Sequence, residues 1–262
     1  MAARASGGAA RAGAPPPQPA PREIRILAFG DSLTEGWTQG GRRFHPYAGR
    51  LQALLRSGDA LGGGGGGDGG GGVVVDQMGV SGEMAADMRA RLDSTLRRAA
   101  AGGAPSRYDW VCLLGGTNDA ACGRGADEIL SDLDAMHAAA SSACARVLAM
   151  TLPPLCCALP EDARASLAAV NSGLRRRWGA APAVATGGGA VVYDAPGGAA
   201  APAGSVLVDL EPLLAPAALG PADAAALWDA DGVHLAAAGY DRVADALFAA
   251  LAPRLGAVGT GW

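Results

Sequence analysis

The chain has 262 residues, of which 50% are hydrophobic and 5% aromatic, and its formal net charge is −4. All 21 basic residues are arginines, which excludes both the lysine of a nucleotide-binding P-loop and the lysine of a Schiff-base enzyme. The chain has no basic block apart from residues 175–177 and no apolar run of the roughly 20 residues that span a membrane, so we expect neither nucleic-acid binding nor a transmembrane segment.

The N-terminal residues 1–22 contain arginines, alanines and a proline cluster, but no continuous apolar stretch of the signal-peptide type. We expect a disordered tail here. An organellar transit peptide is the alternative, because this segment has Arg4 and Arg11 but no acidic residue. The five cysteines show no paired spacing, which favours a reducing compartment and an intracellular, cytoplasmic protein. With only three histidines in the chain, they also indicate no zinc site.

The first ordered element should be an apolar strand at residues 23–29, which ends at Gly30 and leaves Ser32 just beyond its carboxyl end. Strands and helices then alternate. We expect strands at residues 73–76, 110–114, 146–151 and 206–210, and helices at residues 47–57, 84–99, 127–143, 163–178 and 237–251. This alternation predicts a parallel sheet with helices on both faces, whose ligand crevice lies beyond the carboxyl ends of the strands.

Two glycine-rich stretches interrupt the pattern. Residues 62–72 are glycine except for Asp68 and predict a mobile surface insertion, because glycine loses much conformational entropy on ordering. Residues 179–204 are too long for a tight connection, and we expect a short edge strand within them at residues 191–193. We therefore expect one α/β domain over residues 23–255 and a loose tail at 256–262.

Three loops that follow predicted strands carry residues suited to chemistry, and they should converge on one crevice. These are residues 30–35, 79–82 and 115–119. The first contains Ser32, whose hydroxyl is a weak nucleophile unless a general base removes its proton and an acid orients that base.

Residues 231–234, Asp-Gly-Val-His, supply both of these groups. One turn can hold the carboxylate of Asp231 against a ring N–H of His234, which leaves the other ring nitrogen to face Ser32. Acyl transfer also needs hydrogen-bond donors to the developing oxyanion. The backbone N–H of Gly79 and the side-chain amide of Asn118 are of suitable types.

These segments, in this order, resemble the sequence blocks of the GDSL, or SGNH, hydrolase family. The blocks are residues 29–36 (Phe-Gly-Asp-Ser-Leu-Thr-Glu-Gly), residues 116–119 (Gly-Thr-Asn-Asp) and residues 231–234. The resemblance implies that Ser32 is the nucleophile and first oxyanion donor, that Gly79 and Asn118 are the other donors, and that His234 is the base with Asp231 as its partner. It also implies a three-layer α/β/α sandwich around a parallel sheet of about five strands.

The chain departs from the family at Gln77, where an asparagine often stands two residues before the glycine. The role expected of Gly79 needs only its backbone. The common α/β-hydrolase fold is a competitor, but its G-x-S-x-G elbow is absent, because Ser81 is followed by Gly82 and Glu83.

Other residues near the motifs are candidates for simpler roles. We expect Asp119 to be a structural acceptor, and Ser81 and Thr117 to pack the loops. Asp229 is the one close substitute for Asp231. His137 is expected to face solvent from its helix, and His45 is a weaker candidate for lining a pocket.

The function expected from these residues is hydrolysis of small or short-acyl carboxylic esters through an acyl-serine intermediate, with no metal or organic cofactor. Acyl transfer to another acceptor, thioester cleavage and lysophospholipid cleavage are alternatives that would use the same site. A lipid- or glycan-binding module that kept the fold without hydrolysis is an alternative of another class.

Overall fold

The structure is a computed structural model that describes residues 23–57, 72–103, 107–143, 145–179, 184–185, 191–197, 203–216 and 219–255. The expected N-terminal tail, the glycine insertion at residues 62–72 apart from Gly72, much of the stretch at 179–204 and the C-terminal tail lie outside the described residues. The domain boundaries stay predictions.

A mostly parallel sheet forms the centre of the fold, with strand order β4-β1-β5-β6-β9-β8-β7. The first five strands in that order are parallel, and β8 and β7 add an antiparallel edge. The strands are β1 (Ile24–Gly30), β4 (Val73–Gly79), β5 (Trp110–Leu114), β6 (Arg146–Met150), β7 (Val184–Ala185), β8 (Val191–Asp194) and β9 (Val206–Asp209). The predicted parallel sheet is therefore confirmed. The strand expected at residues 191–193 is present as β8, but it is not at the edge, because it pairs with β9 on one side and with the two-residue β7 on the other.

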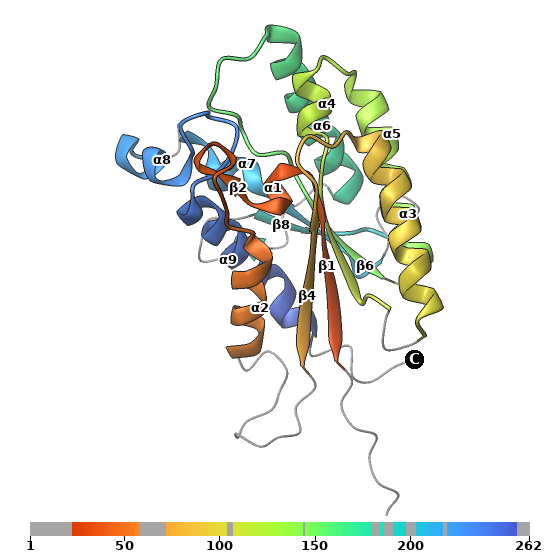
Figure 1. Cartoon of the computed structure of the whole chain (residues 1–262). Helices are drawn as coiled ribbons and strands as arrows, with labels where there is room; N and C mark the ends of the chain where they lie inside the picture. The colour runs from red at the N-terminus through yellow and green to blue at the C-terminus, as the bar shows by residue number, and fades with distance from the viewer. Residues whose placement is uncertain are drawn as a thin grey trace, which may run out of the picture.

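Long helices cover both faces of this sheet, as expected (Figure 1). One face carries α2 (Tyr47–Ser57) and α9 (Ala237–Leu255), which contact each other. The other face carries α3 (Ala85–Ala101), α5 (Ala126–Ser142) and α6 (Glu161–Trp178). No helix in the described part of the chain is long and apolar enough to cross a membrane.

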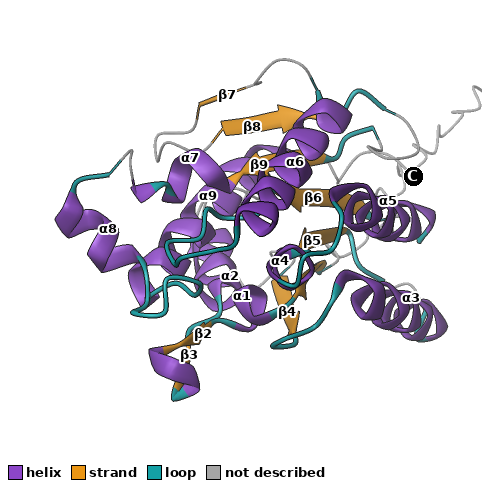
Figure 2. Cartoon of the chain, turned by 90° about the horizontal axis from the view of Figure 1, so that it is seen from above, coloured by secondary structure: helices purple, strands orange, loops and turns teal. Residues whose placement is uncertain are grey.

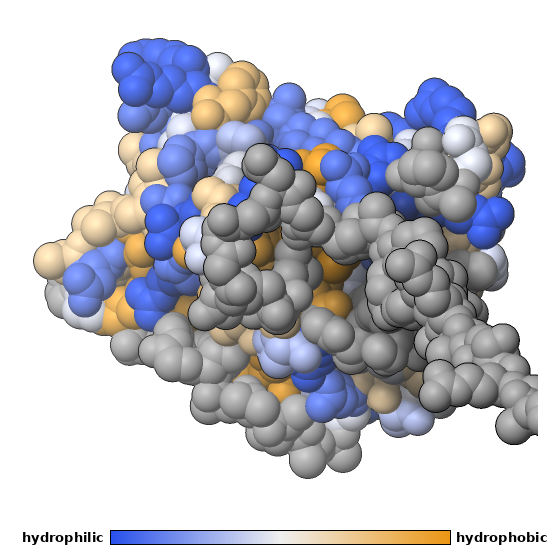
Figure 3. Space-filling model, turned by 90° about the horizontal axis from the view of Figure 1, so that it is seen from below, coloured by the Kyte–Doolittle hydropathy of each residue, from blue (hydrophilic) through white to orange (hydrophobic). Residues whose placement is uncertain are grey.

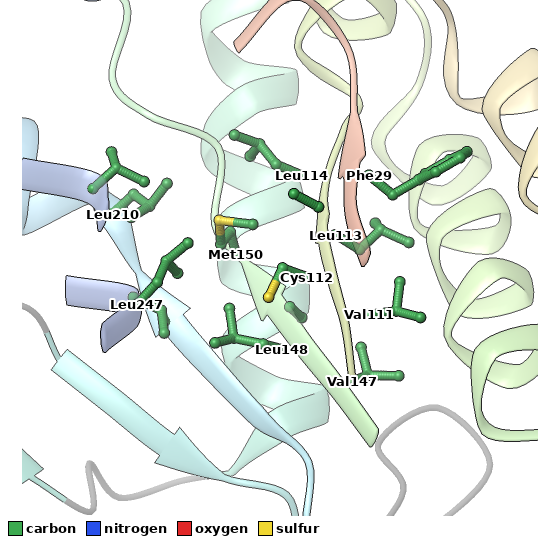
Figure 4. Packing of buried hydrophobic residues seen from close by; sticks show 14 of the residues in the cluster. Phe29, Val111, Cys112, Leu113, Leu114, Val147, Leu148, Met150, Leu210 and Leu247 are labelled. Carbon is green, nitrogen blue, oxygen red and sulfur yellow. The ribbon is translucent and has the colours of Figure 1, made fainter. Parts of the chain in front are cut away.

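The central strands are apolar on both sides because helices cover both of their faces. All five residues of β5 are buried, as are the last four of β6. Figure 4 shows Cys112 and Leu148 on the same side of the strands as Leu247 of α9, with Val111 and Val147 on the opposite side. Apolar side chains of consecutive residues therefore enter two separate core layers.

Shorter elements gather where the parallel strands end (Figure 2). They are α1 (Ser32–Glu35), the hairpin strands β2 (Trp37–Thr38) and β3 (Arg43–Phe44), the 3-10 turn Gln39–Gly41 between them, α4 (Thr117–Ala121), α7 (Leu210–Leu214) and α8 (Pro221–Leu227). At the opposite end, seen from below, several hydrophobic residues are visible on the surface (Figure 3). The residues singled out by their chemistry lie in the first of these two regions.

His137 corrects one expectation, because it is buried rather than solvent-facing, with 1% of its surface exposed. The helix that carries it, α5, packs against α3, α6 and β6, so its alanine-rich sequence gave no contrast between an inner and an outer face. The imidazole meets the edge of Trp178 at 5.2 Å between ring centroids. Burial, with a smaller effect from the nearby Arg177, lowers the pKa of His137 to about 3.

The buried His137 should make the protein less stable as the pH falls. Its pKa is about 3 in the folded protein, whereas the ordinary pKa of histidine is 6.5. The unfolded chain therefore binds more protons between these values, and stability decreases as the pH falls from 6.5 toward 3. We predict that lowering the pH from 7.5 to 5 decreases the free energy of urea unfolding of the wild type by about 2 kcal/mol more than that of His137→Leu. An equal decrease in both proteins would contradict the neutral, buried imidazole.

Candidate active site

Ser32 is the first residue of α1, which begins directly after β1. Asp31 caps this helix, because its carboxylate accepts a hydrogen bond from the backbone N–H of Leu33 at 2.9 Å. Burial raises the pKa of Asp31 to about 7, although the Leu33 N–H acts in the opposite direction. The helix ends at Gly36, whose φ of +83° is favoured by glycine. Ser32 is thus fixed at the carboxyl end of a central strand, with 6% of its surface exposed.

The side chains of Ser32, His234 and Asp231 form one continuous chain of hydrogen bonds. Asp231 Oδ2 lies 2.7 Å from His234 Nδ1, and His234 Nε2 lies 2.9 Å from Ser32 Oγ. Because an ionised carboxylate can only accept, Nδ1 is the protonated nitrogen and Nε2 is left to accept the proton of the serine hydroxyl. The structure therefore brings together three residues that are up to 202 positions apart in the sequence.

The turn at residues 231–234 orients Asp231 through its backbone. The other carboxylate oxygen, Oδ1, accepts the N–H groups of Val233 and His234, both at 2.9 Å. Partial burial alone would raise the pKa of Asp231, but the hydrogen bonds from His234 and Val233 outweigh it and the pKa is lowered. The carboxylate thus stays ionised beside the imidazole.

The loop after β6 packs against this turn. The carbonyl of Gly232 accepts the N–H of Cys156 at 2.7 Å. A Cβ on Gly232, whose φ is +66°, would lie only 2.7 Å from the backbone nitrogen of Cys157. The loop is anchored in turn by Asn171, whose side chain bonds both the N–H and the carbonyl of Leu152, at 2.7 and 2.9 Å.

Gly79 is the last residue of β4 and pairs with Gly30 of β1. A Cβ on Gly79 would lie 2.2 Å from the backbone nitrogen of Glu35 and 2.7 Å from the carbonyl oxygen of Asp31. The next residue, Val80, donates its N–H to the carbonyl of Gly30 at 3.1 Å. The backbone of Gly79 is therefore packed against the helix that begins with Ser32.

Asn118 lies in α4, which follows β5, the strand that pairs with β1 on the side opposite β4. Its side-chain nitrogen donates to the carbonyl of Glu83 at 2.9 Å, which uses one of its two N–H groups. The neighbouring Asp119 is buried and accepts from the N–H of Ala85 and from Arg124, both at 2.8 Å. These contacts agree with the structural role expected of Asp119 and fix the amide of Asn118 in place.

Arg91 of α3 is a supporting residue that sequence reasoning missed. Its guanidinium donates to the carbonyls of Met78 at 2.9 Å and Gly30 at 3.0 Å, and it pairs with Glu83. It also lies over the ring of Phe29, 3.9 Å from the centroid. Arg91 thus ties together the ends of β1 and β4 and the loop that Asn118 contacts, but in the sequence it is one of several arginines on a helix.

Trp37 is a second residue that was missed, and its ring packs on His234 with 4.0 Å between the centroids. Its backbone carbonyl accepts the hydroxyl of Tyr240 at 2.7 Å. The aromatic ring therefore flanks the imidazole on the side of the β2–β3 hairpin. A tryptophan five residues after the serine carried no motif-level signal.

The remaining candidates have other contacts. His45 pairs with Asp241 of α9 at 2.9 Å, and Ser81 bonds the carboxylate of Glu35 through its N–H at 2.9 Å. The carboxylate of Asp229 accepts from the N–H groups of Ala230 at 2.8 Å and Gly40 at 3.4 Å. Thr117 is buried. Within the described ranges, no group of three or more His, Cys, Asp or Glu side chains could hold a metal ion.

Residues 28–242 of the chain match the model of the GDSL-like lipase/acylhydrolase family. No curated protein matches the sequence significantly.

Solved structures with a similar fold include three from bacteria. An acetylxylan esterase from Geobacillus stearothermophilus is 18% identical, with 94% of this chain and 98% of that one covered and a TM-score of 0.59. A G-D-S-L family lipolytic protein from Veillonella parvula DSM 2008 is 18% identical, with coverages of 85% and 95% and a TM-score of 0.57. A psychrotrophic esterase from Pseudoalteromonas sp. is 17% identical, with coverages of 86% and 95% and a TM-score of 0.53. Similarity at these identities shows a shared fold.

The close contact between Gly232 and the loop after β6 predicts an unusually costly substitution. Gly232→Ala adds a Cβ where the nearest backbone atom is 2.7 Å away, whereas Gly82→Ala, also at positive φ, meets no atom within 4 Å. Both variants carry the strain of an alanine at positive φ, about 1–2 kcal/mol. We predict that Gly232→Ala lowers the free energy of urea unfolding by at least about 1 kcal/mol more than Gly82→Ala. Equal losses would show that the loop does not brace the turn.

Proposed function

Since the chain belongs to the GDSL-like lipase/acylhydrolase family, we propose that it is a serine hydrolase of carboxylic esters with Ser32 as its nucleophile. The observation that carries this proposal is the hydrogen-bonded series Asp231–His234–Ser32, with distances of 2.7 and 2.9 Å. A serine, a general base within hydrogen-bond distance and an acid that orients the base are the groups that acyl transfer requires.

The reaction begins with attack of Ser32 Oγ on the ester carbonyl while its proton moves to His234 Nε2. Asp231 stabilises the imidazolium that forms, and its ionised state is favoured by the two backbone N–H groups that it accepts. The imidazolium then gives its proton to the oxygen of the leaving alcohol as the bond between the carbonyl carbon and that oxygen breaks. Water, deprotonated by the same imidazole, then attacks the acyl-serine. The bond between the acyl carbon and Ser32 Oγ breaks, the imidazolium returns the proton to Oγ, and the carboxylic acid is released.

We assign the stabilisation of the oxyanion to three donors, which are the backbone N–H groups of Ser32 and Gly79 and the amide of Asn118. Asn118 is suited to this because one N–H bonds Glu83 and holds the amide still, while the second N–H remains for the substrate. Preorganised donors of this kind contribute roughly 3 kcal/mol each to lowering the barrier. Esters with a small acyl group are the substrates that we propose first.

Replacement of Ser32 tests the nucleophile. We predict that Ser32→Ala loses labelling by a fluorophosphonate probe and lowers the kcat for p-nitrophenyl acetate by roughly a thousandfold or more. Ser81→Ala is the matched control, since this exposed serine lies in the neighbouring loop and should keep both properties. Undiminished turnover and labelling in Ser32→Ala would contradict the assignment.

Replacement of the two nearby aspartates tests the acid. Asp231→Asn keeps the size of the side chain but removes the charge that fixes the Nδ1 proton, so kcat/KM should fall by about two to four orders of magnitude. Asp229→Asn should change it little, because that carboxylate bonds Gly40 and Ala230 instead of the imidazole. A larger loss in Asp229→Asn than in Asp231→Asn would reverse the assignment of the acid.

A further inference from the structure

Trp37, whose ring packs on the imidazole of His234, and Phe44, its cross-strand partner, form what we call the aromatic shelf. They are directly opposed residues of the antiparallel β2–β3 hairpin, so their side chains lie on the same face of it. Phe44 has 52% of its surface exposed, and the one other exposed large hydrophobic residue among those described is Val80, at 43%. The ring of Phe44 is therefore free to contact a molecule bound next to Trp37.

The aromatic shelf is attached by several contacts to the elements that form the site. Gly41 lies against the indole of Trp37, since a Cβ there would be 2.7 Å from the ring nitrogen. The carbonyl of Trp37 accepts the hydroxyl of Tyr240, and the N–H of Gly40 bonds Asp229, next to the turn of Asp231. The N–H of His45, directly after Phe44, donates to the carbonyl of Gly36 at 2.7 Å, at the end of the helix that begins with Ser32.

The position of the aromatic shelf indicates which part of an ester lies next to it. In the proposed reaction His234 Nε2 gives its proton to the oxygen of the leaving alcohol, so this oxygen must come within hydrogen-bond distance of the imidazole. The group attached to that oxygen therefore passes beside the imidazole, where the ring of Trp37 lies at 4.0 Å between centroids. The oxyanion donors Gly79 and Asn118 come instead from the ends of β4 and β5.

We propose that Trp37 and Phe44 bind the alcohol part of the ester and favour a flat apolar group there, such as a benzyl group. This inference rests on the proposed function and names the substrate class of the same site. An aromatic group on the shelf covers the exposed face of Phe44 and gains stacking or edge-to-face contact with both rings. Methyl and ethyl esters can place the same oxygen beside His234 but cannot make these contacts.

The test compares benzyl acetate with methyl acetate, which share an acyl group and have alcohols of similar acidity. We expect kcat/KM of the wild type to be higher for benzyl acetate, and the benzyl-to-methyl ratio to fall about fivefold to tenfold in Phe44→Ala, mainly through KM. Phe44→Trp should keep the ratio. Val80→Ala, which removes the other exposed hydrophobic side chain, should also leave it unchanged.

An unchanged benzyl-to-methyl ratio in Phe44→Ala would overturn the subsite. So would an effect confined to the acyl group, seen as a changed ratio of benzyl butyrate to benzyl acetate, because the shelf would then lie on the acyl side. Methyl acetate cleavage by the wild type and its loss in Ser32→Ala test the proposed function separately. If the wild type cleaves neither acetate, the proposed function fails and the subsite with it.

Discussion

The close approach of α1 to the ends of β1 and β4 is the constraint on which the rest of the site depends. It requires glycine at both strand ends. A Cβ on Gly30 would lie 2.2 Å from the hydroxyl of Thr34 and 2.3 Å from the carbonyl oxygen of Leu114, and a Cβ on Gly79 would lie 2.2 Å from the nitrogen of Glu35. Without side chains there, the helix rests directly on the sheet. Ser32 thereby reaches the imidazole that arrives from the other end of the chain.

Polar side chains that take no part in the proposed reaction form hydrogen bonds to the loops at this edge of the sheet. Arg91 bonds the carbonyls of Met78 and Gly30, and Asp119 holds the start of α3 through the N–H of Ala85. Asn171 anchors the loop that packs on Gly232. A site built from loops gains precise geometry only when such contacts restrict each loop. The positions of Ser32, Asn118 and His234 thus depend on Arg91 and Asn171 of the long helices and on Asp119 of α4.

The sequence was sufficient for the features that follow from regular patterns. Apolar runs of strand length alternate with helices, and parallel strands place their carboxyl ends together, so the convergence of the loops at residues 30–35, 79–82 and 115–119 could be expected. The hairpin with Trp37 and Phe44 could not, because strands of two residues have no readable periodicity. The burial of His137 depends on which face of α5 meets its neighbours. An alanine-rich helix does not show this in its sequence.

The most direct measurement is a crystal structure of the protein after reaction with a fluorophosphonate, whose tetrahedral adduct resembles the intermediate of ester cleavage. We predict that phosphorus is bonded to Ser32 Oγ and that a phosphonyl oxygen lies within hydrogen-bond distance of the Gly79 N–H and the Asn118 amide. His234 should remain bonded to Asp231. An adduct on another residue, or a phosphonyl oxygen that contacts neither Gly79 nor Asn118, would contradict it.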